Sequence, residues 1–369
     1  MPAGHTVGAQ FHAVWDRTGP TYGAVHDDVL DKLAAAGVQA VRIDVAAQAF
    51  NPSPGTYVAR PYGGKMEDTL TALRSRDMKA LIVLNETPVF AHPAFTGTKA
   101  LPDSPSYYTG IGKWFTEYLA PWNDALLGVE VFNEANLAGP GGFDQAVTTP
   151  RPEHYADCLR AYYDAAKSSS NPQLPVVFGA PESISVDPTK DASTPKTNFI
   201  GLAYARVRAT TPGRFPWDVM AVHVYPAAAR YSATDDWVAF YRHLAALRAR
   251  QRAEGDTTPW YITESGHSAH ENVGTPQAYE TAVTEAQQGT YIVEDLDGVA
   301  RDYPEVRLHI TYNAWEKGDP ATSTAAAGLT LQATRHQYGF GVLRFADRGT
   351  GKPVYAAIQA RQRALGVIP

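Results

Sequence analysis

Short apolar runs recur along the whole chain, and each is followed by a segment whose apolar residues have helical spacing. The runs are rich in β-branched and aromatic residues, which suits strands that are covered on both faces. Eight can be marked, at residues 6–11, 40–45, 79–85, 127–133, 175–180, 218–225, 259–264 and 306–313. Strands that alternate with helices in this way predict a parallel sheet with right-handed crossovers.

The number of units predicts how the sheet closes. Eight strand–helix units form a (β/α)8 barrel. The alternative is an open, doubly wound sheet, but the first run continues as TVGAQFHAVW and has no G-x-G-x-x-G loop after it. Because no linker or sequence repeat divides the chain, we expect an α/β fold of the TIM barrel type, with residues 1–369 as a single catalytic domain.

Two of the helical segments carry end signals. In segment 27–37, Asp27 can cap the first turn and Gly37 can end the helix. In segment 275–296, Thr275 can serve as the cap and Pro276 can take the first helical position. We therefore expect these two helices to begin after Asp27 and Thr275.

Composition and charge narrow the classes of molecule that the protein could bind. The net charge of −6 and the absence of Lys/Arg runs argue against nucleic acid and anionic membranes, so a neutral substrate is favoured. No run approaches the ~20 apolar residues of a membrane span. The start MPAGHTVGAQ has no signal-peptide pattern, and we expect an extracellular, mature form, with a cytoplasmic location as the alternative. The oligomeric state is left open.

Metal and thiol chemistry find little support. The single cysteine, Cys158, excludes an intrachain disulfide and a Cys-based zinc site, and its helical spacing from Tyr155 and Tyr162 favours a packing role. His267 and His270 form a loop H-x-x-H rather than the helical H-E-x-x-H of zinc hydrolases. We expect no metal and no cofactor.

Polar residues gather where the predicted strands end. In (β/α)8 barrels the active site is built at the C-terminal ends of the strands, so these residues are candidates for chemistry. The tryptophans at this face can stack on a sugar ring. The candidates are His12, Trp15, Asn85, Glu86, Asn133, Glu134, His223, Tyr225, Glu264, Asn313 and Trp315.

Two carboxylates stand out, Glu134 in VFNEAN and Glu264 in YITESG. Strands four and seven lie three steps apart around an eight-stranded ring, so their ends face each other across the mouth. Such a pair can hydrolyse a glycosidic bond, because one carboxyl protonates the leaving oxygen while the other attacks the anomeric carbon.

At this point the sequence resembles the clan A retaining glycoside hydrolases. In that clan the acid/base Glu follows Asn at the end of the fourth strand and the nucleophile Glu ends the seventh. Three stretches are similar to bacterial family 39 and family 5 type enzymes: AAAGVQAVRIDVAAQAFNPSPGTY, LIVLNETPVFAHP and FADRGTGKPVYAAI. The resemblance covers nearly the whole chain. It departs at Ala135, where the clan has proline, and in the loop SGHSAH, which carries no family signature.

The resemblance implies a role for each matched residue. Glu134 would be the acid/base, Glu264 the nucleophile, and Asn133 the donor to the sugar 2-hydroxyl. The residues around the nucleophile would be His223 and Tyr225, which flank it, and Arg42, which forms an ion pair with it. Trp315 would be the floor under the bound sugar. His12, Trp15 and Asn85 complete the expected substrate-binding set.

We therefore expect an O-glycosidase that cleaves an oligosaccharide or polysaccharide by double displacement, with pentosides such as arabinofuranosides or xylosides favoured. An endo-acting β-glycanase of the same clan is the alternative. From other classes, a non-catalytic carbohydrate-binding barrel and a metal-dependent barrel hydrolase remain. The first would tolerate loss of a carboxylate, and the second would need an acidic cluster that the strand ends do not supply.

Overall fold

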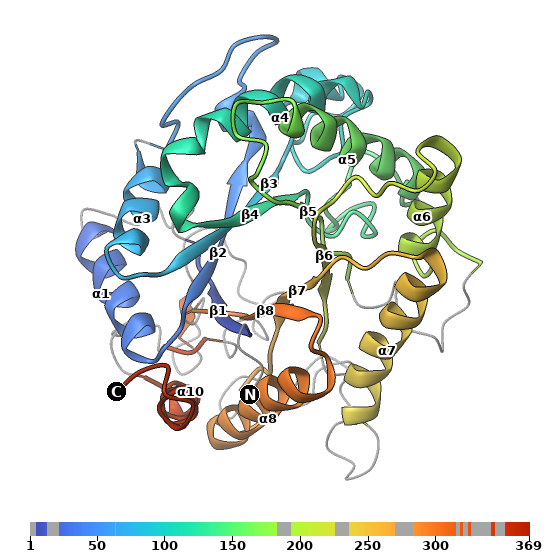
Figure 1. The fold of residues 1–369 in the computed structure, drawn as a ribbon. Helices are drawn as coiled ribbons and strands as arrows, with labels where there is room; N and C mark the ends of the chain where they lie inside the picture. Colours follow the sequence, from blue (N-terminus) through green and yellow to red (C-terminus); the bar gives the residue numbers. More distant parts are fainter. Residues whose placement is uncertain are drawn as a thin grey trace.

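The chain forms an eight-stranded parallel (β/α)8 barrel in a computed structural model (Figure 1). The structure describes residues 5–12, 22–62, 64–182, 193–225, 236–269, 283–314, 318–319, 324–325, 341–343 and 351–369. The barrel strands are β1 (Thr6–Gln10), β2 (Ala40–Ala46), β3 (Lys79–Asn85), β4 (Leu126–Val131), β5 (Val176–Phe178), β6 (Met220–His223), β7 (Trp260–Ser265) and β8 (Val306–Thr311). All eight predicted strands are present, which confirms the predicted fold class.

The strands follow one another around the ring in chain order. The hydrogen-bonded sheet runs β5-β4-β3-β2-β1-β8-β7-β6. A parallel bridge between Val177 and Val219 brings its two ends, β5 and β6, together. The carboxyl ends of β4 and β7 therefore face each other across the mouth, as an eight-unit barrel requires.

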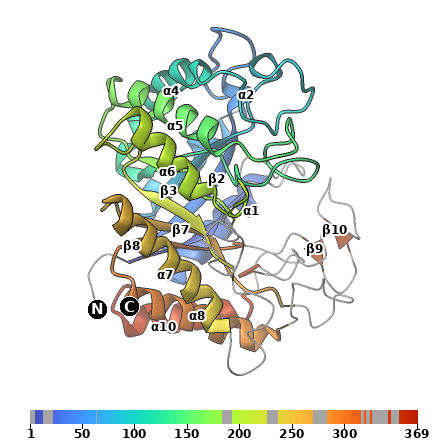
Figure 2. The same ribbon diagram turned by 90° about the vertical axis from the view of Figure 1, so that its right-hand side faces the viewer.

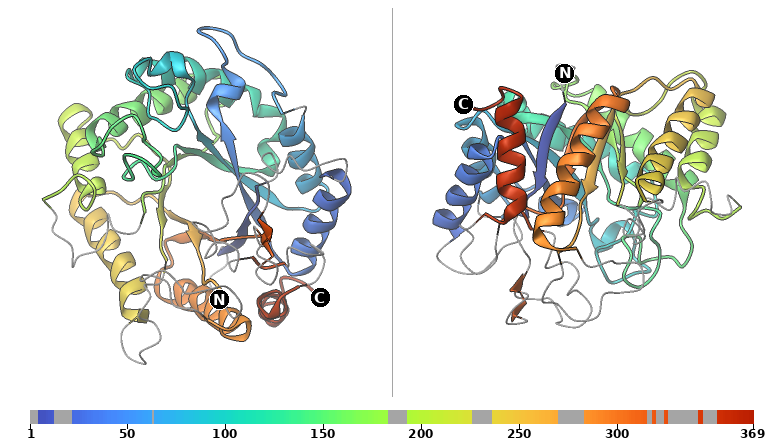
Figure 3. Two further views of the ribbon diagram at one scale, coloured as in Figure 1. Left: turned by 180° about the vertical axis from the view of Figure 1, so that it is seen from behind. Right: turned by 90° about the horizontal axis from the view of Figure 1, so that it is seen from below.

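The helices form the outer ring (Figures 1 and 3). They are α1 (Tyr22–Ala35), α3 (Lys65–Arg74), α4 (Ser106–Tyr118), α5 (Pro152–Lys167), α6 (Phe199–Thr210), α7 (Asp236–Glu254), α8 (Glu285–Asp302) and α10 (Pro353–Ala364). The last, α10, lies between α8 and α1, and Gln359 and Gln362 donate to the carbonyls of Ala35 and Gly37. None of the described helices combines the length and hydropathy that a membrane crossing needs.

Short elements line the side of the barrel where the strands end. The helix α2 (Ala47–Phe50) follows β2 directly. The 3₁₀ helix η1 (Val89–Ala91) follows β3 on this side, whereas η2 (Ala120–Ala125) joins α4 to the start of β4 at the opposite end of the barrel. Figure 2 shows α2 and the small hairpin of β9 (Gly318–Asp319) and β10 (Thr324–Ala325) on the same side.

The core has two layers because strand residues alternate between the faces of the sheet. On β2, Val41, Ile43 and Val45 point outward and pack with helix residues in the larger core cluster. The inward positions of the strands form a smaller cluster that includes Ala40, and this cluster fills the lower barrel. Arg42 and Asp44 continue the inward series of β2, so the apolar filling gives way to charged residues toward the mouth.

Two helix starts differ from prediction. The helix α1 already runs from Tyr22, so Asp27 lies inside it and is not its cap; the exposed Asp27 carboxylate instead pairs with Arg76 at 3.5 Å. The predicted cap Thr275 and the following Pro276 lie outside the described residues. In the described chain, Thr284 caps α8 in a capping box with Gln287.

The packing role expected for Cys158 is confirmed. Its thiol is fully buried on α5, and burial raises the pKa of Cys158 far above its ordinary value. A thiol in this state is a poor nucleophile, because the thiolate is the reactive form.

Candidate active site

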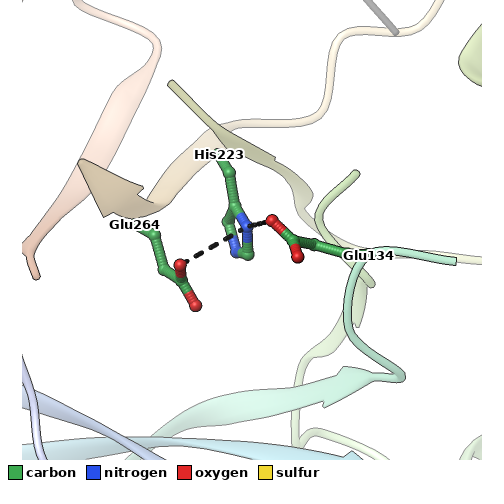
Figure 4. Close-up of side chains that lie close together, drawn as sticks. All are labelled: Glu134, His223 and Glu264. Atoms are coloured by element: carbon green, nitrogen blue, oxygen red, sulfur yellow. Dashed lines mark hydrogen bonds and ion pairs between the residues drawn. The ribbon is translucent and has the colours of Figure 1, made fainter. Parts of the chain in front are cut away.

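Three side chains from different strands meet at the mouth of the barrel (Figure 4). The imidazole of His223, at the end of β6, lies between the carboxyl groups of Glu134 and Glu264. Its Nδ1 is 2.8 Å from Glu134 Oε1 and 3.7 Å from Glu264 Oε2. The histidine is fully buried, whereas the side chains of Glu134 and Glu264 are 12% and 14% exposed, so both carboxyl groups can be reached from the mouth.

The backbone after β4 turns so that consecutive side chains reach the site. In a regular strand Asn133 and Glu134 would point to opposite faces of the sheet. Here Phe132 and Glu134 have φ values of 69° and 44°, in the left-handed region that costs non-glycine residues energy. The Glu134 N–H donates to the Ala180 carbonyl at 2.9 Å, which holds the turn against the end of β5. The buried strand thereby delivers both polar residues to the mouth.

Glu264 reaches the site through an irregularity in β7. The pairing register of β7 shifts between Val222 and His223 on one side and between Ile262 and Ser265 on the other. Shifts of this kind re-aim a side chain that strict alternation would send outward. As a result Thr263 and Glu264, although adjacent, both contact groups inside the barrel.

The guanidinium of Arg42 joins the two sides of the site. Its Nη1 donates to Glu264 Oε1 at 2.7 Å, and its Nη2 donates to Asn133 Oδ1 at 2.6 Å. The Nε and Nη2 groups form a bidentate pair with Glu130, at 2.8 and 3.1 Å. Both Arg42 and Glu130 are fully buried, so each charge depends on the other for compensation.

A third acidic group, Asp44, lies beside Arg42. Asp44 Oδ1 is 3.6 Å from Arg42 Nη1, and Asp44 Oδ2 accepts from Gln10 Nε2 at 2.7 Å. His12 Nδ1 lies 3.1 Å from the same Oδ2 atom. On the other flank, the Tyr225 hydroxyl donates to Glu264 Oε2 at 2.8 Å. Glu264 is thus contacted on both oxygens.

The two carboxyl groups have opposite pKa shifts. Burial raises the pKa of Glu134, and the negative charge of Glu264 adds to this, against the opposing effect of His223. Burial also acts to raise the pKa of Glu264, but the charges of His223 and Arg42 and the Tyr225 hydrogen bond outweigh it and hold that pKa below its ordinary value. Of the two carboxyl groups, Glu134 therefore takes up a proton more readily than Glu264.

The spacing of the two carboxyl groups matches one mechanistic class. The ligand atoms of Glu134, His223 and Glu264 all lie within 4.8 Å of one another. In glycosidases, carboxyl groups about 5–5.5 Å apart accompany retention, and about 6.5–9.5 Å accompany inversion. With one oxygen of each carboxylate within 4.8 Å of the other, the pair fits the shorter, retaining spacing better than the inverting one.

The predicted site residues lie in three places: at the mouth, outside the described residues, and against the helix layer. Asn85, His223, Tyr225 and Asn133 lie at the ends of their strands and are buried or nearly so, and His12 is partly exposed beside Asp44. Trp15 and Trp315 lie outside the described residues, as does His270. His267 contacts Asp295 of α8 at 2.8 Å and is buried, so its partner comes from the helix layer.

Sequence reasoning missed Glu130, Asp44 and Gln10. Each is a polar residue within or directly after an apolar run, at even spacing from a recognised residue: Asp44 is two positions beyond Arg42, and Gln10 is two positions before His12. Period-two spacing places such residues on the same face of a strand. That signal could have identified Asp44 and Gln10 as inward-facing.

The same three side chains are the group that could hold a metal ion among the described residues, namely Glu134, His223 and Glu264. The set supplies two carboxylate oxygens and one imidazole nitrogen, which zinc accepts. However, His223 Nδ1 is already in contact with Glu134, and Arg42 and Tyr225 contact the two oxygens of Glu264. A positive guanidinium against a ligand oxygen disfavours a cation, so the donor set fits a metal poorly.

Comparison with known proteins supports the barrel. No family model and no curated protein matches the sequence. Among solved structures, a family 39 glycoside hydrolase from Bacteroides cellulosilyticus WH2 is similar over 96% of this chain, with 18% identity and a TM-score of 0.64; the chain spans 62% of that protein.

Two further structures illustrate the likeness. A family 5, subfamily 18 glycoside hydrolase from Streptomyces cattleya in complex with Manβ1-4GlcNAc has 20% identity and a TM-score of 0.67, with 98% and 81% of the two chains covered. An exo-β-1,4-mannosidase from an Opitutaceae bacterium has 15% identity and a TM-score of 0.61, with 98% and 60% covered. At these sequence identities the similarity shows a shared fold only. A functional assignment therefore has to rest on the side chains of the site.

The Arg42 contacts predict a stability test. Replacing Arg42 with Gln would leave the buried carboxylates of Glu130 and Glu264 without their counter-charge, so unfolding should become easier by about 3–5 kcal/mol at pH 7. The deficit relative to wild type should shrink toward pH 5, because the unpaired carboxylates can then take up protons. Denaturant unfolding at the two pH values measures both effects. An equal deficit at both would contradict the charge argument.

Proposed function

We propose that this protein is a retaining O-glycosidase that works by double displacement. The observation that carries the proposal is the pair of carboxyl groups of Glu134 and Glu264 at the barrel mouth: one oxygen of each lies within 4.8 Å of the other, and the two pKa values are moved in opposite directions. An ionised carboxylate beside a protonated one is what the first step of glycoside retention requires.

In the first step, Glu264 attacks the anomeric carbon and the bond from that carbon to the leaving oxygen breaks. Glu134 gives its proton to that oxygen, so the departing group leaves as a neutral alcohol. A covalent ester between the sugar and Glu264 results. In the second step, Glu134, now a carboxylate, removes a proton from water, whose oxygen displaces Glu264 from the anomeric carbon. The sugar is released with its original configuration.

The surrounding residues orient these groups. Arg42 and Tyr225 hold the two oxygens of Glu264 at 2.7 and 2.8 Å, which fixes the plane of the attacking carboxylate. Arg42 also donates a hydrogen bond to the side-chain oxygen Oδ1 of Asn133. This leaves the side-chain N–H groups of Asn133 to donate to the sugar 2-hydroxyl. His12 and Asn85 line the same mouth as further substrate contacts, and Trp15 and Trp315 complete the proposed set.

Pentosides, such as arabinofuranosides or xylosides, are the proposed substrate class. The support is the resemblance of the second-strand region to family 39 and family 5 type enzymes and the similarity to a solved family 39 structure. Hexosides, mannosides above all, are the second candidate. Three solved neighbours favour them: one is described as an exo-β-1,4-mannosidase and two are in complex with Manβ1-4GlcNAc.

Two other classes fit the site less well. A non-catalytic carbohydrate-binding barrel has no need for two carboxyl groups held at catalytic spacing with opposite pKa shifts. A metal-dependent hydrolase would have to place its cation beside the guanidinium of Arg42. The contacts of the two carboxyl groups, Arg42 and Tyr225 on Glu264 and His223 on Glu134, fit glycoside cleavage better.

Substitution of the two carboxyl groups should separate their roles. Glu264→Gln removes the attacking group and should lower kcat on every substrate by about 10⁴-fold or more. Glu134→Ala should lower kcat/KM strongly on substrates with poor leaving groups and only mildly on dinitrophenyl glycosides, whose leaving group needs no proton. Its kcat should fall on both, because the second step loses its base. Steady-state kinetics on the two leaving groups gives the comparison. Normal turnover by Glu264→Gln would rule the proposal out.

The pH dependence of kcat/KM should be bell-shaped. Glu264 must be ionised, so activity should rise as the pH passes its lowered pKa. Glu134 must be protonated, so activity should fall as the pH passes its raised pKa. The two apparent values belong to the coupled pair. With a dinitrophenyl substrate, the Glu134→Ala variant should lose the alkaline limb, which would assign this limb to Glu134. A limb that remains in the variant would contradict the assignment.

A substrate panel decides between the two sugar classes. Nitrophenyl α-L-arabinofuranoside and β-D-xyloside should be cleaved at least about tenfold more efficiently than the mannoside and glucoside, since the additional carbon of a hexose, where it fits poorly, costs about that much. The assays are run with and without EDTA, which should have no effect. A faster mannoside reaction would favour the second candidate, and EDTA inactivation would favour metal chemistry.

A further inference from the structure

Glu130 lies beneath the two carboxyl groups and is not used in the proposed reaction. It is a fully buried carboxylate one residue before the end of β4, on the barrel interior. Its Oε1 and Oε2 accept from Nη2 and Nε of Arg42. The Ala180 N–H donates to Oε1 at 3.0 Å, and the Thr263 hydroxyl lies at 3.4 Å from the same atom. A buried charge with this many partners is held in one orientation.

The contacts of Arg42 show what Glu130 fixes. A guanidinium has five N–H donors in a rigid plane. In Arg42 all of them are used: Nε and one Nη2 hydrogen on Glu130, the other Nη2 hydrogen on Asn133, and the two Nη1 hydrogens on Gln10 and Glu264. Because the plane is rigid, the bidentate pair with Glu130 sets the direction of the N–H that reaches Glu264.

Glu130 is also linked to the other carboxyl group through Ala180, in the backbone just after β5. Ala180 donates its N–H to Glu130 and accepts the N–H of Glu134 on its carbonyl, at 3.0 and 2.9 Å. The turn at Glu134 has a positive φ, so it needs such support to persist. One buried side chain therefore supports the placement of both groups.

The charge of Glu130 matters as much as its position. Arg42 shares one positive charge between two carboxylates, Glu130 on one side of the guanidinium and Glu264 on the other. Without Glu130, the whole charge of Arg42 would act on Glu264 and lower the pKa of Glu264 further. A carboxylate held as an anion more strongly is a weaker nucleophile.

We propose that Glu130 is the positioning residue of this site, which aims the guanidinium of Arg42 at Glu264 and partly neutralises it so that Glu264 stays nucleophilic. The inference rests on the proposed glycosidase function. The titratable and charged groups that face Glu264 from the elements packed against it, among the described residues, are Arg42, Asp44, Glu134, His223, Tyr225 and Tyr312.

The first test is Glu130→Gln, which removes the charge and keeps the size. The acid limb of the kcat/KM profile should move to lower pH by about half to one unit, and kcat should fall about 10- to 100-fold with little change in KM. An acid limb that stays in place or moves to higher pH would overturn the proposal. Asp256→Asn is the matched control, since it alters a buried, hydrogen-bonded carboxylate in the loop before β7, at the opposite end of the barrel. It should leave the limb unmoved.

The second variant, Glu130→Asp, covers the case in which the glutamine variant does not fold. The shorter side chain keeps the charge and loses the bidentate geometry, so the acid limb should stay near its wild-type position while kcat falls. A wild-type kcat in Glu130→Asp would show that the placement of the carboxylate does not matter, and would overturn the positioning role.

A titration without substrate separates this inference from the proposed function. The side-chain carbon of Glu264 can be followed by ¹³C NMR in glutamate-labelled protein, with Glu264→Gln to assign the signal. The pKa of Glu264 should be lower in Glu130→Gln than in wild type. That result would support the charge role even if no glycoside were cleaved, and an unchanged titration would overturn it even in an active glycosidase.

Discussion

The buried guanidinium of Arg42 is the interaction on which the arrangement of this site depends. It is a single positive charge inside the barrel with carboxylates on two sides, Glu130 from β4 and Glu264 from β7. Such a charge is costly to bury unless it is paired and its donors are satisfied. Every one of its donors has an acceptor here, and these acceptors come from β1, β4 and β7. The cost of burial is therefore offset only when the strands are in register.

The site also depends on backbone that departs from regular strand geometry. Phe132 and Glu134 have positive φ values, and the pairing register shifts at the end of β7. Neither feature stabilises a sheet. Each lets two adjacent residues reach the barrel interior, Asn133 with Glu134 and Thr263 with Glu264. The hydrogen bonds to Ala180 and the Arg42 contacts supply the compensation that holds these conformations.

Much of this architecture could be predicted from the sequence, because the strands are apolar on both faces and stand out from amphipathic helices. The carboxyl-end rule then located Glu134 and Glu264. Other features could not be predicted. Asp27 looked like a cap because it precedes an apolar stripe, yet α1 extends upstream of it. The contact of His223 with Glu134 depends on the barrel closing between β5 and β6, which no local pattern encodes. Glu130 was overlooked because a charged residue inside an apolar run reads as an exception until its partner on β2 is known.

The mutual repulsion of Glu134 and Glu264 has a consequence for the second half of the proposed cycle. Part of the proton affinity of Glu134 comes from the negative charge on Glu264. Once Glu264 is esterified to the sugar, that charge is gone, and Glu134 holds a proton less tightly in an otherwise unchanged environment. The group that donates in one half-reaction thus becomes ready to accept in the next without any conformational rearrangement. The covalent state of one side chain resets the acidity of the other, and the barrel can stay rigid throughout turnover.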